Sequence, residues 1–338
     1  MGETPKIKEI AKRLEGLLEP LSNEISRFGI GHLVHMPSHI WKQVGRYEKA
    51  AKVNIRALEM AESYYAHFNI SEHSSSFNSF HRNIYFCHRI TFVVYASMMN
   101  GQFERADQFA TLLLEQCKVS ISNIPFFYEF ASWNDKTALK FGKWKSVQPR
   151  NVDVGEQQGY ARTMNAFSRA FALASDGECD RARSVYSDEF MPGFENDTVR
   201  SIAIMDIQSA GTLLDIARSS LMARAAEKCE DDSDQAVSWW RDAVRHSDSV
   251  VSMEPPFWPL SPRCCLGQLY LEQGEFEMAE QEFEIDLAYS PQSGWALRGM
   301  IDALKGRRNK NEKAVQKYEK RFDKAWKRAD MQINRACY

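Results

Sequence analysis

Polar and apolar positions along most of this chain follow the period of an amphipathic helix, and short breaks separate the helical stretches. Residues 41–63 show the arrangement plainly. Gly45 ends one helical stretch, Tyr47 fills the turn, and Ala50 and Ala57 let two helices approach closely. Spacing of this kind predicts a helical hairpin. Stretches with the period of a β-strand are nearly absent, so the sequence predicts an all-α fold.

The hairpin pattern recurs at Gly101–Ala106 and Gly177–Ala182, and in weaker form at Gly142–Trp144. The clearest copy lies near the C-terminal end and comprises Gly267, Tyr270, Gly274, Phe276, Ala279, Phe283 and Pro291. This spacing resembles the tetratricopeptide repeat (TPR), whose period is roughly 34 residues. The resemblance implies a TPR-like helical-hairpin superhelix (α-solenoid) of about six to seven helix pairs with a concave inner surface.

Within this array we expect an N-terminal helix at 1–30, TPR-like hairpins at 31–250, and further hairpins with a terminal helix at 251–338. Two stretches interrupt the pattern. Residues 64–83 are serine-rich and too long for a repeat turn, so they could form an inserted loop that covers the concave face. Residues 253–263 hold four prolines, which forbid a regular helix and indicate either an ordered loop or a break in the array.

Composition adds size and charge to this picture. The chain has 338 residues, of which 44% are hydrophobic, so it can bury a large core. Its net charge is −2 and no basic stripe stands out, which argues against nucleic acid as a partner. No apolar run is long enough to span a bilayer, and no glycine-rich phosphate loop is present, so neither a membrane nor a nucleotide cofactor is expected.

The seven cysteines form no CxxC pair, and Cys264 and Cys265 are adjacent. We expect reduced thiols in a reducing compartment. The N-terminus is polar and shows no secretory signal, so a cytoplasmic location is predicted.

Three of the eight histidines fall within residues 31–40. On a helix of about 100° per residue, His32, His35 and His39 lie within about 60° of one another on one face. In the repeat that the resemblance implies, the same three places look into the concave groove. The register set by Gly101 puts His88 at the matching place of the next repeat, followed on that face by Tyr95. The sequence therefore predicts four imidazoles in a common hollow.

Neutral imidazole is the commonest ligand for borderline metals, and three nitrogens with an open position suit a divalent transition metal such as zinc, copper or iron(II). His35 and His39 have the i, i+4 spacing at which two rings share one ion. Glu62 and Glu254 are the candidate carboxylates, each as a ligand, an orienting group or a general base. A histidine on an inner helix face is more often a packing residue than a ligand, so packing stays the alternative.

Pro37 leaves two possibilities open. Inside a helix it would kink the chain and tilt His32 and His35 relative to His39. If it begins a helix instead, the first two histidines lie on a preceding turn, and the angular argument does not apply to them.

A second resemblance covers about residues 30–330. The segments Gly31–Ile40 and Val44–Tyr47 resemble an uncharacterised group of bacterial TPR-type proteins with a GHLVHMPSHI motif and a VGRY-type turn. His88 matches the first histidine of a family His-Asn-x-His segment, in which Arg89 and Thr91 replace the other two. A third element, EPPxW followed by an arginine and Gly-Trp-Ala-Leu, is matched by Glu254, Pro255, Pro256, Trp258, Arg263 and Gly294–Leu297.

The resemblance implies the fold and a metal, but no particular reaction. Tyr95, which follows His88 on the inner face, and Trp258 and Arg263 of the third element are the candidate cofactor-binding residues. The chain departs from the family in one respect, because residues 1–30 contain no histidine where relatives usually carry a further histidine-bearing helix.

Three functions fit these patterns. The first is a metal-dependent enzyme acting on a small molecule or peptide. The second is a non-catalytic scaffold whose groove binds a peptide or protein partner. A generic receptor for peptide C-termini is disfavoured, because Lys42 is the only cation at the groove positions. The third is a metal-free enzyme that uses the histidines as acid–base groups.

Overall fold

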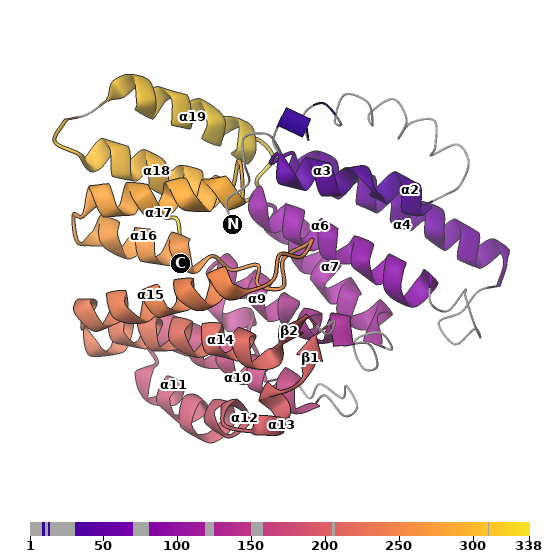
Figure 1. Ribbon diagram of the computed structural model, residues 1–338, viewed down its shortest axis with the longest axis horizontal. Helices are drawn as coiled ribbons and strands as arrows, with labels where there is room; N and C mark the ends of the chain where they lie inside the picture. Colours follow the sequence, from indigo (N-terminus) through magenta and orange to yellow (C-terminus); the bar gives the residue numbers. More distant parts are fainter. Residues whose placement is uncertain are drawn as a thin grey trace. The chain divides into compact units, whose positions relative to one another are not determined.

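The computed structural model describes residues 9, 10, 13, 31–69, 81–118, 125–149, 158–204, 207–309 and 311–338. In these residues the regular structure is almost entirely helical, which confirms the all-α prediction (Figure 1). The chain divides into two compact units. The first comprises Met1–Val119 with Phe283–Asn334, and the second comprises Ser120–Glu282 with Arg335–Tyr338. The predicted N-terminal helix at 1–30 lies almost wholly outside the described residues.

The described helices of the first unit are α2 (Gly31–His35), α3 (Pro37–Gln43), α4 (Tyr47–His67), the π-helix η2 (His81–Phe86), α6 (Cys87–Met99), α7 (Phe103–Gln116), α18 (Gly294–Gly306) and α19 (Glu312–Trp326). Helix α17 (Phe276–Tyr289) contributes residues to both units. Helix α4 packs against α2, α3 and α6, while α6 also packs against α7 and α18 packs against α19. Figure 1 shows α4, α6 and α7 side by side.

The described elements of the second unit are η3 (Pro125–Ser132), α9 (Trp133–Lys140), η4 (Trp144–Ser146), α10 (Gln158–Ser175), α11 (Cys179–Val185), η6 (Tyr186–Phe190), α12 (Met191–Phe194), α13 (Asp197–Arg200), β1 (Ala203–Ile204), β2 (Gln208–Ser209), α14 (Ala210–Ala225), η7 (Ala226–Glu230), α15 (Ser233–Ser249) and α16 (Pro262–Glu272). The two short strands pair antiparallel, with Ala203 opposite Ser209. Helix α14 packs against α10 and α15, and α15 packs against α16.

The predicted hairpin turns share one backbone geometry. Gly45, Gly101, Gly142, Gly177 and Gly274 all have positive φ, between 67° and 81°. At each turn the residue after the glycine donates its backbone N–H to the carbonyl five residues earlier, as in Arg46 to Trp41 at 2.7 Å. This is the Schellman ending of a helix, and it favours glycine because only glycine adopts positive φ without a Cβ clash. The turn prediction is confirmed at all five positions.

The proline at position 37 begins a helix. Helix α2 ends at His35, Met36 is the turn, and Pro37 is the first residue of α3. Met36 nevertheless keeps right-handed helical angles, and its N–H donates to the carbonyl of His32 at 3.2 Å. The path is therefore an interrupted helix, and His35 and His39 stay on the same face.

The expected insert at 64–83 is shorter in the structure. Helix α4 continues to His67, and η2 begins at His81. The possible cover over the concave face falls on residues 70–80, which lie outside the described part of the chain. The proline-rich stretch is an ordered loop, as one of the two predictions had it. Phe257 and Trp258 are buried, Glu254–Pro255 is a cis peptide, and Ser261 caps α16.

The expectation of reduced thiols is wrong for six of the seven cysteines. Disulfides join Cys87 to Cys117, Cys179 to Cys229 and Cys265 to Cys337, whereas Cys264 is buried and is not part of a disulfide. Sequence spacing hid them because their partners are 30, 50 and 72 residues apart, and helix packing brings them together. Each cross-link closes a long loop, so each restricts the unfolded chain strongly.

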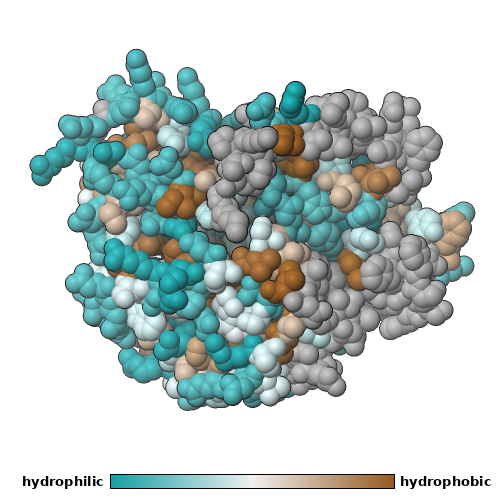
Figure 2. All heavy atoms as spheres, in the orientation of Figure 1, coloured by the Kyte–Doolittle hydropathy of each residue, from teal (hydrophilic) through white to brown (hydrophobic). Residues whose placement is uncertain are grey.

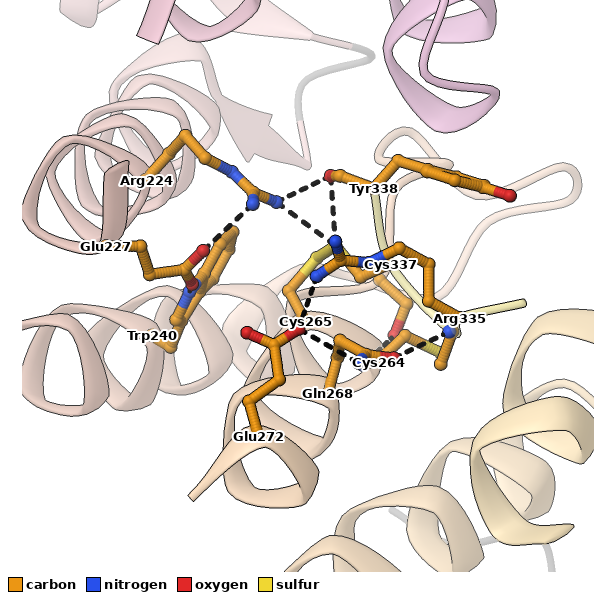
Figure 3. The surroundings of a disulfide bond; sticks show 12 residues. Arg224, Glu227, Trp240, Cys264, Cys265, Gln268, Glu272, Arg335, Cys337 and Tyr338 are labelled. Carbon is orange, nitrogen blue, oxygen red and sulfur yellow. Dashed lines mark hydrogen bonds and ion pairs between the residues drawn. A yellow bond between two sulfur atoms is a disulfide. The ribbon is translucent and has the colours of Figure 1, made fainter. Parts of the chain in front are cut away.

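The Cys265–Cys337 disulfide fastens residues 335–338 to α16, as Figure 3 shows. The fully buried Arg224 of α14 donates to the backbone oxygen of Tyr338 at 2.5 Å and is paired with Glu227 at 2.8 Å. Arg335 is paired with Glu272 at 2.5 Å. Charged groups and a covalent bond therefore hold this segment together.

The view in Figure 2 shows mostly hydrophilic residues on the coloured surface, with hydrophobic residues in small separate groups. A search of the described residues finds no helix with the length and apolarity needed to cross a bilayer.

The disulfides predict that only one of the seven cysteines is outside a disulfide. Protein alkylated in denaturant without reductant should carry the label on Cys264 alone, and mass spectrometry of its peptides measures this. After reduction all seven cysteines should be labelled. Labelling of both members of any of the three pairs before reduction would show that this pair is not bonded.

The turn geometry predicts unequal costs for two glycine substitutions. A Cβ at Gly177 meets nothing within 4 Å, so Gly177→Ala should cost only the strain of positive φ, roughly 1–2 kcal/mol. A Cβ at Gly101 would lie 2.3 Å from the Trp326 ring, so Gly101→Ala should lower the free energy of unfolding by about 2–5 kcal/mol. Denaturant unfolding of both variants measures the difference, and equal losses would contradict the Trp326 contact.

Candidate metal centre

Three of the four predicted histidines meet in the first unit. His35 ends α2, His39 lies in the first turn of α3, and His88 lies in the first turn of α6. One ring nitrogen from each of the three lies within 4.8 Å of the other two. The ring centroids of His35 and His88 are 5.0 Å apart, and those of His39 and His88 are 5.7 Å apart. We call His35, His39 and His88 the histidine triad.

Local packing explains why the triad forms. Both helices that carry His35 and His39 pack on α4, and α6 packs on the same helix beside them. The Phe92 ring, one turn after His88, meets all three imidazoles edge-on, with centroids 4.7 to 5.1 Å away. This apolar wall leaves the ring nitrogens facing one another.

A hydrogen bond from α4 fixes the ring of His35. Asn54 is fully buried, and its Nδ2 donates to the Ala50 carbonyl at 2.7 Å, which sets the orientation of the amide. Its Oδ1 therefore accepts from Nδ1 of His35, 2.6 Å away. With the proton on Nδ1, the lone pair of His35 is on Nε2, which lies 3.0 Å from Nε2 of His39. Metal-binding histidines characteristically have their second nitrogen held by such a partner.

Burial keeps His35 and His88 in the form that binds metals. It lowers the pKa of His35 to about 2, with the nearby His88 as a further cause. Burial also lowers the pKa of His88 to about 3, and His39 and His32 contribute. Both rings are therefore neutral at pH 7, and neutral imidazole is the ligand form.

His32 lies beside the triad without joining its group of ligand atoms. Its ring centroid is 5.8 Å from that of His35 and 4.2 Å from that of Tyr85. Burial lowers the pKa of His32, and the positive charge of Arg89 lowers it further. The Nδ1 atom of His32 is buried and has no hydrogen-bond partner in the described residues.

The structure does not place Glu62 and Tyr95 with the ligand atoms of the triad. Glu62 is exposed on α4. Tyr95 is buried on α6, and its hydroxyl lies 3.3 Å from that of Ser290. The described atoms that could bind one ion are therefore three nitrogens and no carboxylate oxygen.

The remaining predicted site residues belong to the second unit. Glu254 lies in the proline-rich loop, and Trp258 packs on Phe167 with ring centroids 5.6 Å apart. Arg263 is paired with Glu282 at 2.7 Å and with Asp248, so its charge is compensated.

Sequence reasoning missed two buried polar sites, one at Asn54 and one around Lys136. Asn54 could have been noticed, because it is the polar residue on a face of α4 that otherwise reads Ala50, Val53, Ala57, Leu58 and Ala61.

In the second unit Lys136 is paired with Glu129, which also accepts from the Tyr160 hydroxyl, and all three are buried. Burial lowers the pKa of Lys136 and raises that of Tyr160. Each of these three polar groups therefore has a partner, as buried polar groups usually do.

Comparison with protein-family models finds no match, and comparison with curated protein sequences finds none either. The TPR resemblance therefore stays a prediction from the sequence, and the argument for function depends on the triad.

The Asn54 contact predicts the proton position on His35. In metal-free protein the ring should stay neutral from pH 8 down to pH 5, with its proton on Nδ1, because its pKa is about 2. Nitrogen-15 NMR of histidine-labelled protein measures both properties. Asn54→Leu removes the acceptor and should shift the proton partly to Nε2, whereas Ser63→Ala on the exposed side of α4 should change nothing. An unchanged His35 spectrum in Asn54→Leu would refute the assignment.

Proposed function

We propose that this chain is a metal-binding protein in which His35, His39 and His88 hold one divalent transition metal, zinc, copper or iron(II). The metal keeps at least one coordination position open and supports a reaction on a small molecule. The observation that carries the proposal is the convergence of three ring nitrogens within 4.8 Å, one of them oriented by a buried amide.

The distances fit a shared ion after small movements. Two metal–nitrogen bonds of about 2.0–2.1 Å at a tetrahedral angle place their nitrogens about 3.3 Å apart. The Nε2 atoms of His35 and His39 are 3.0 Å apart already. The widest pair of triad nitrogens, within 4.8 Å, would close by about 1.5 Å, which side-chain rotation supplies. In this structure Nε2 of His39 donates to His35, so the proton leaves that nitrogen when a metal binds.

The donor set favours catalysis over a purely structural role. Structural zinc sites use four protein ligands, whereas catalytic sites use three and leave a position for water or substrate. An all-nitrogen set also disfavours magnesium and calcium, which prefer oxygen.

We propose that the predicted hairpins stack as a TPR-like superhelix. The five Schellman turns at the predicted glycines support this proposal. The alternative function, a groove that binds a peptide or protein partner, has less support, because Tyr95 is buried within the first unit.

The three disulfides favour oxidising surroundings over the expected cytoplasm.

Metal analysis tests the proposal. Protein purified without an affinity tag and loaded with zinc should hold one equivalent after dialysis. His39→Ala removes one of three ligands, so its affinity should fall by more than the roughly 10–100-fold typical of losing an orienting partner. His67→Ala, on the exposed end of α4, is the matched control and should bind as the wild type does. Equal substoichiometric zinc in all three proteins would defeat the proposal.

A further inference from the structure

A buried arginine lies next to the histidine triad. Arg89 follows His88 in α6, and its side chain is fully buried. Its Nη1 donates to the Ala57 carbonyl at 3.4 Å. Its Nε and Nη2 atoms have no hydrogen-bond partner in the part of the chain that the structure describes.

The two unpaired nitrogens form one edge of the guanidinium group. Nε–H and Nη2–H point the same way, and this edge binds both oxygens of a carboxylate in parallel. Gly31 leaves space for the group, since a Cβ there would lie 3.0 Å from the Ala57 carbonyl oxygen, 3.3 Å from Nη1 and 3.4 Å from Nη2.

Other cations buried to the same degree are compensated. Lys136 is paired with Glu129, and Arg224 with Glu227. Burial lowers the pKa of Arg89, and the groups that oppose this shift are the phenols of Tyr65 and Tyr85, with no carboxylate among them. Burying an unpaired charge is unfavourable by several kcal/mol, which makes a missing counter-ion the simplest explanation.

The charge of Arg89 also acts on the candidate metal centre. It lowers the pKa of His32, His35 and His88. A divalent metal on neutral imidazoles would add two further positive charges, and the triad supplies no carboxylate. The site as a whole therefore favours an anion. His32 offers another unpaired atom, Nδ1, on a ring whose centroid is 5.8 Å from that of His35.

We propose that Arg89 binds the carboxylate of a small-molecule substrate whose reacting end reaches the metal on the histidine triad. This inference rests on the proposed metal site. A carboxylate fits better than a phosphate, because one planar edge with two donors matches two carboxylate oxygens and a single positive charge. The Nε and Nη2 atoms of Arg89 are buried, so the ligand reaches them by displacing the protein atoms that cover them.

Stability of metal-free variants gives the first test. Arg89→Met replaces an uncompensated charge by an apolar side chain of similar length, and it should raise Tm by about 2 °C or more. Arg105→Gln is the matched control, because Arg105 is paired with Glu48 at 2.9 Å in the same unit, and its loss should lower Tm. If Arg89→Met lowers Tm at least as much as Arg105→Gln does, Arg89 has a counter-ion within the protein, and the proposal is overturned.

Anion binding gives the second test. Cobalt(II) is loaded into the triad, and its visible spectrum is followed during titration with acetate or with acetamide, the neutral isostere. Wild type and Arg105→Gln should respond to acetate and not to acetamide. Arg89→Met should bind cobalt normally but acetate at least tenfold more weakly.

The outcomes separate the two proposals. Equal acetate responses in wild type and Arg89→Met, or no response in wild type, would overturn the role of Arg89 and leave the metal site standing. The same holds if Arg89→Met fails to bind cobalt while the wild type binds it. A wild type that takes up no cobalt would refute the metal site, and the carboxylate proposal with it.

Discussion

The hydrogen bond between His35 and Asn54 is the contact on which the candidate site depends. Asn54 has no exposed surface, and its amide is fixed by the Ala50 carbonyl of its own helix, so it gives the His35 ring one orientation and one proton position. Without this hydrogen bond the His35 ring could rotate, or its proton could lie on Nε2, the nitrogen that faces His39. A buried amide of this kind must be satisfied on both sides, which makes the arrangement specific as well as stable.

The need for a hydrogen-bonding or charged partner also distinguishes the other buried polar groups from one another. Glu129, Lys136 and Tyr160 satisfy one another within the second unit, as do Arg224 and Glu227. In both networks each positive charge has a negative partner. Arg89 is different, because one complete edge of its guanidinium group has no partner in the described residues. Its charge lowers the pKa of His35 and His88, so it acts on two of the imidazoles that would bind a metal.

The repeated turns are the structural basis of the fold. Each of the five glycines with positive φ ends one helix and directs the chain into the next, and each turn uses the same backbone hydrogen bond. The turns differ in what surrounds them. Gly101 is covered by Trp326, whereas Gly177 has open space around it. Turns with the same backbone conformation therefore differ in how closely other side chains pack on them. The disulfides add constraints over much longer sequence separations than the turns do.

The sequence by itself determined the helical class, the five turns and the common face of His35 and His39, because each depends on residues within one or two helical turns of each other. It also indicated His88, since the turn at Gly101 fixes the register of the helix that precedes it. Tertiary structure decided everything that depends on packing between distant segments: the three disulfides, the Asn54 contact from α4, the position of His32 outside the triad, and the unpaired edge of Arg89. These features depend on which side chains meet across helices, and local spacing carries no information about such meetings.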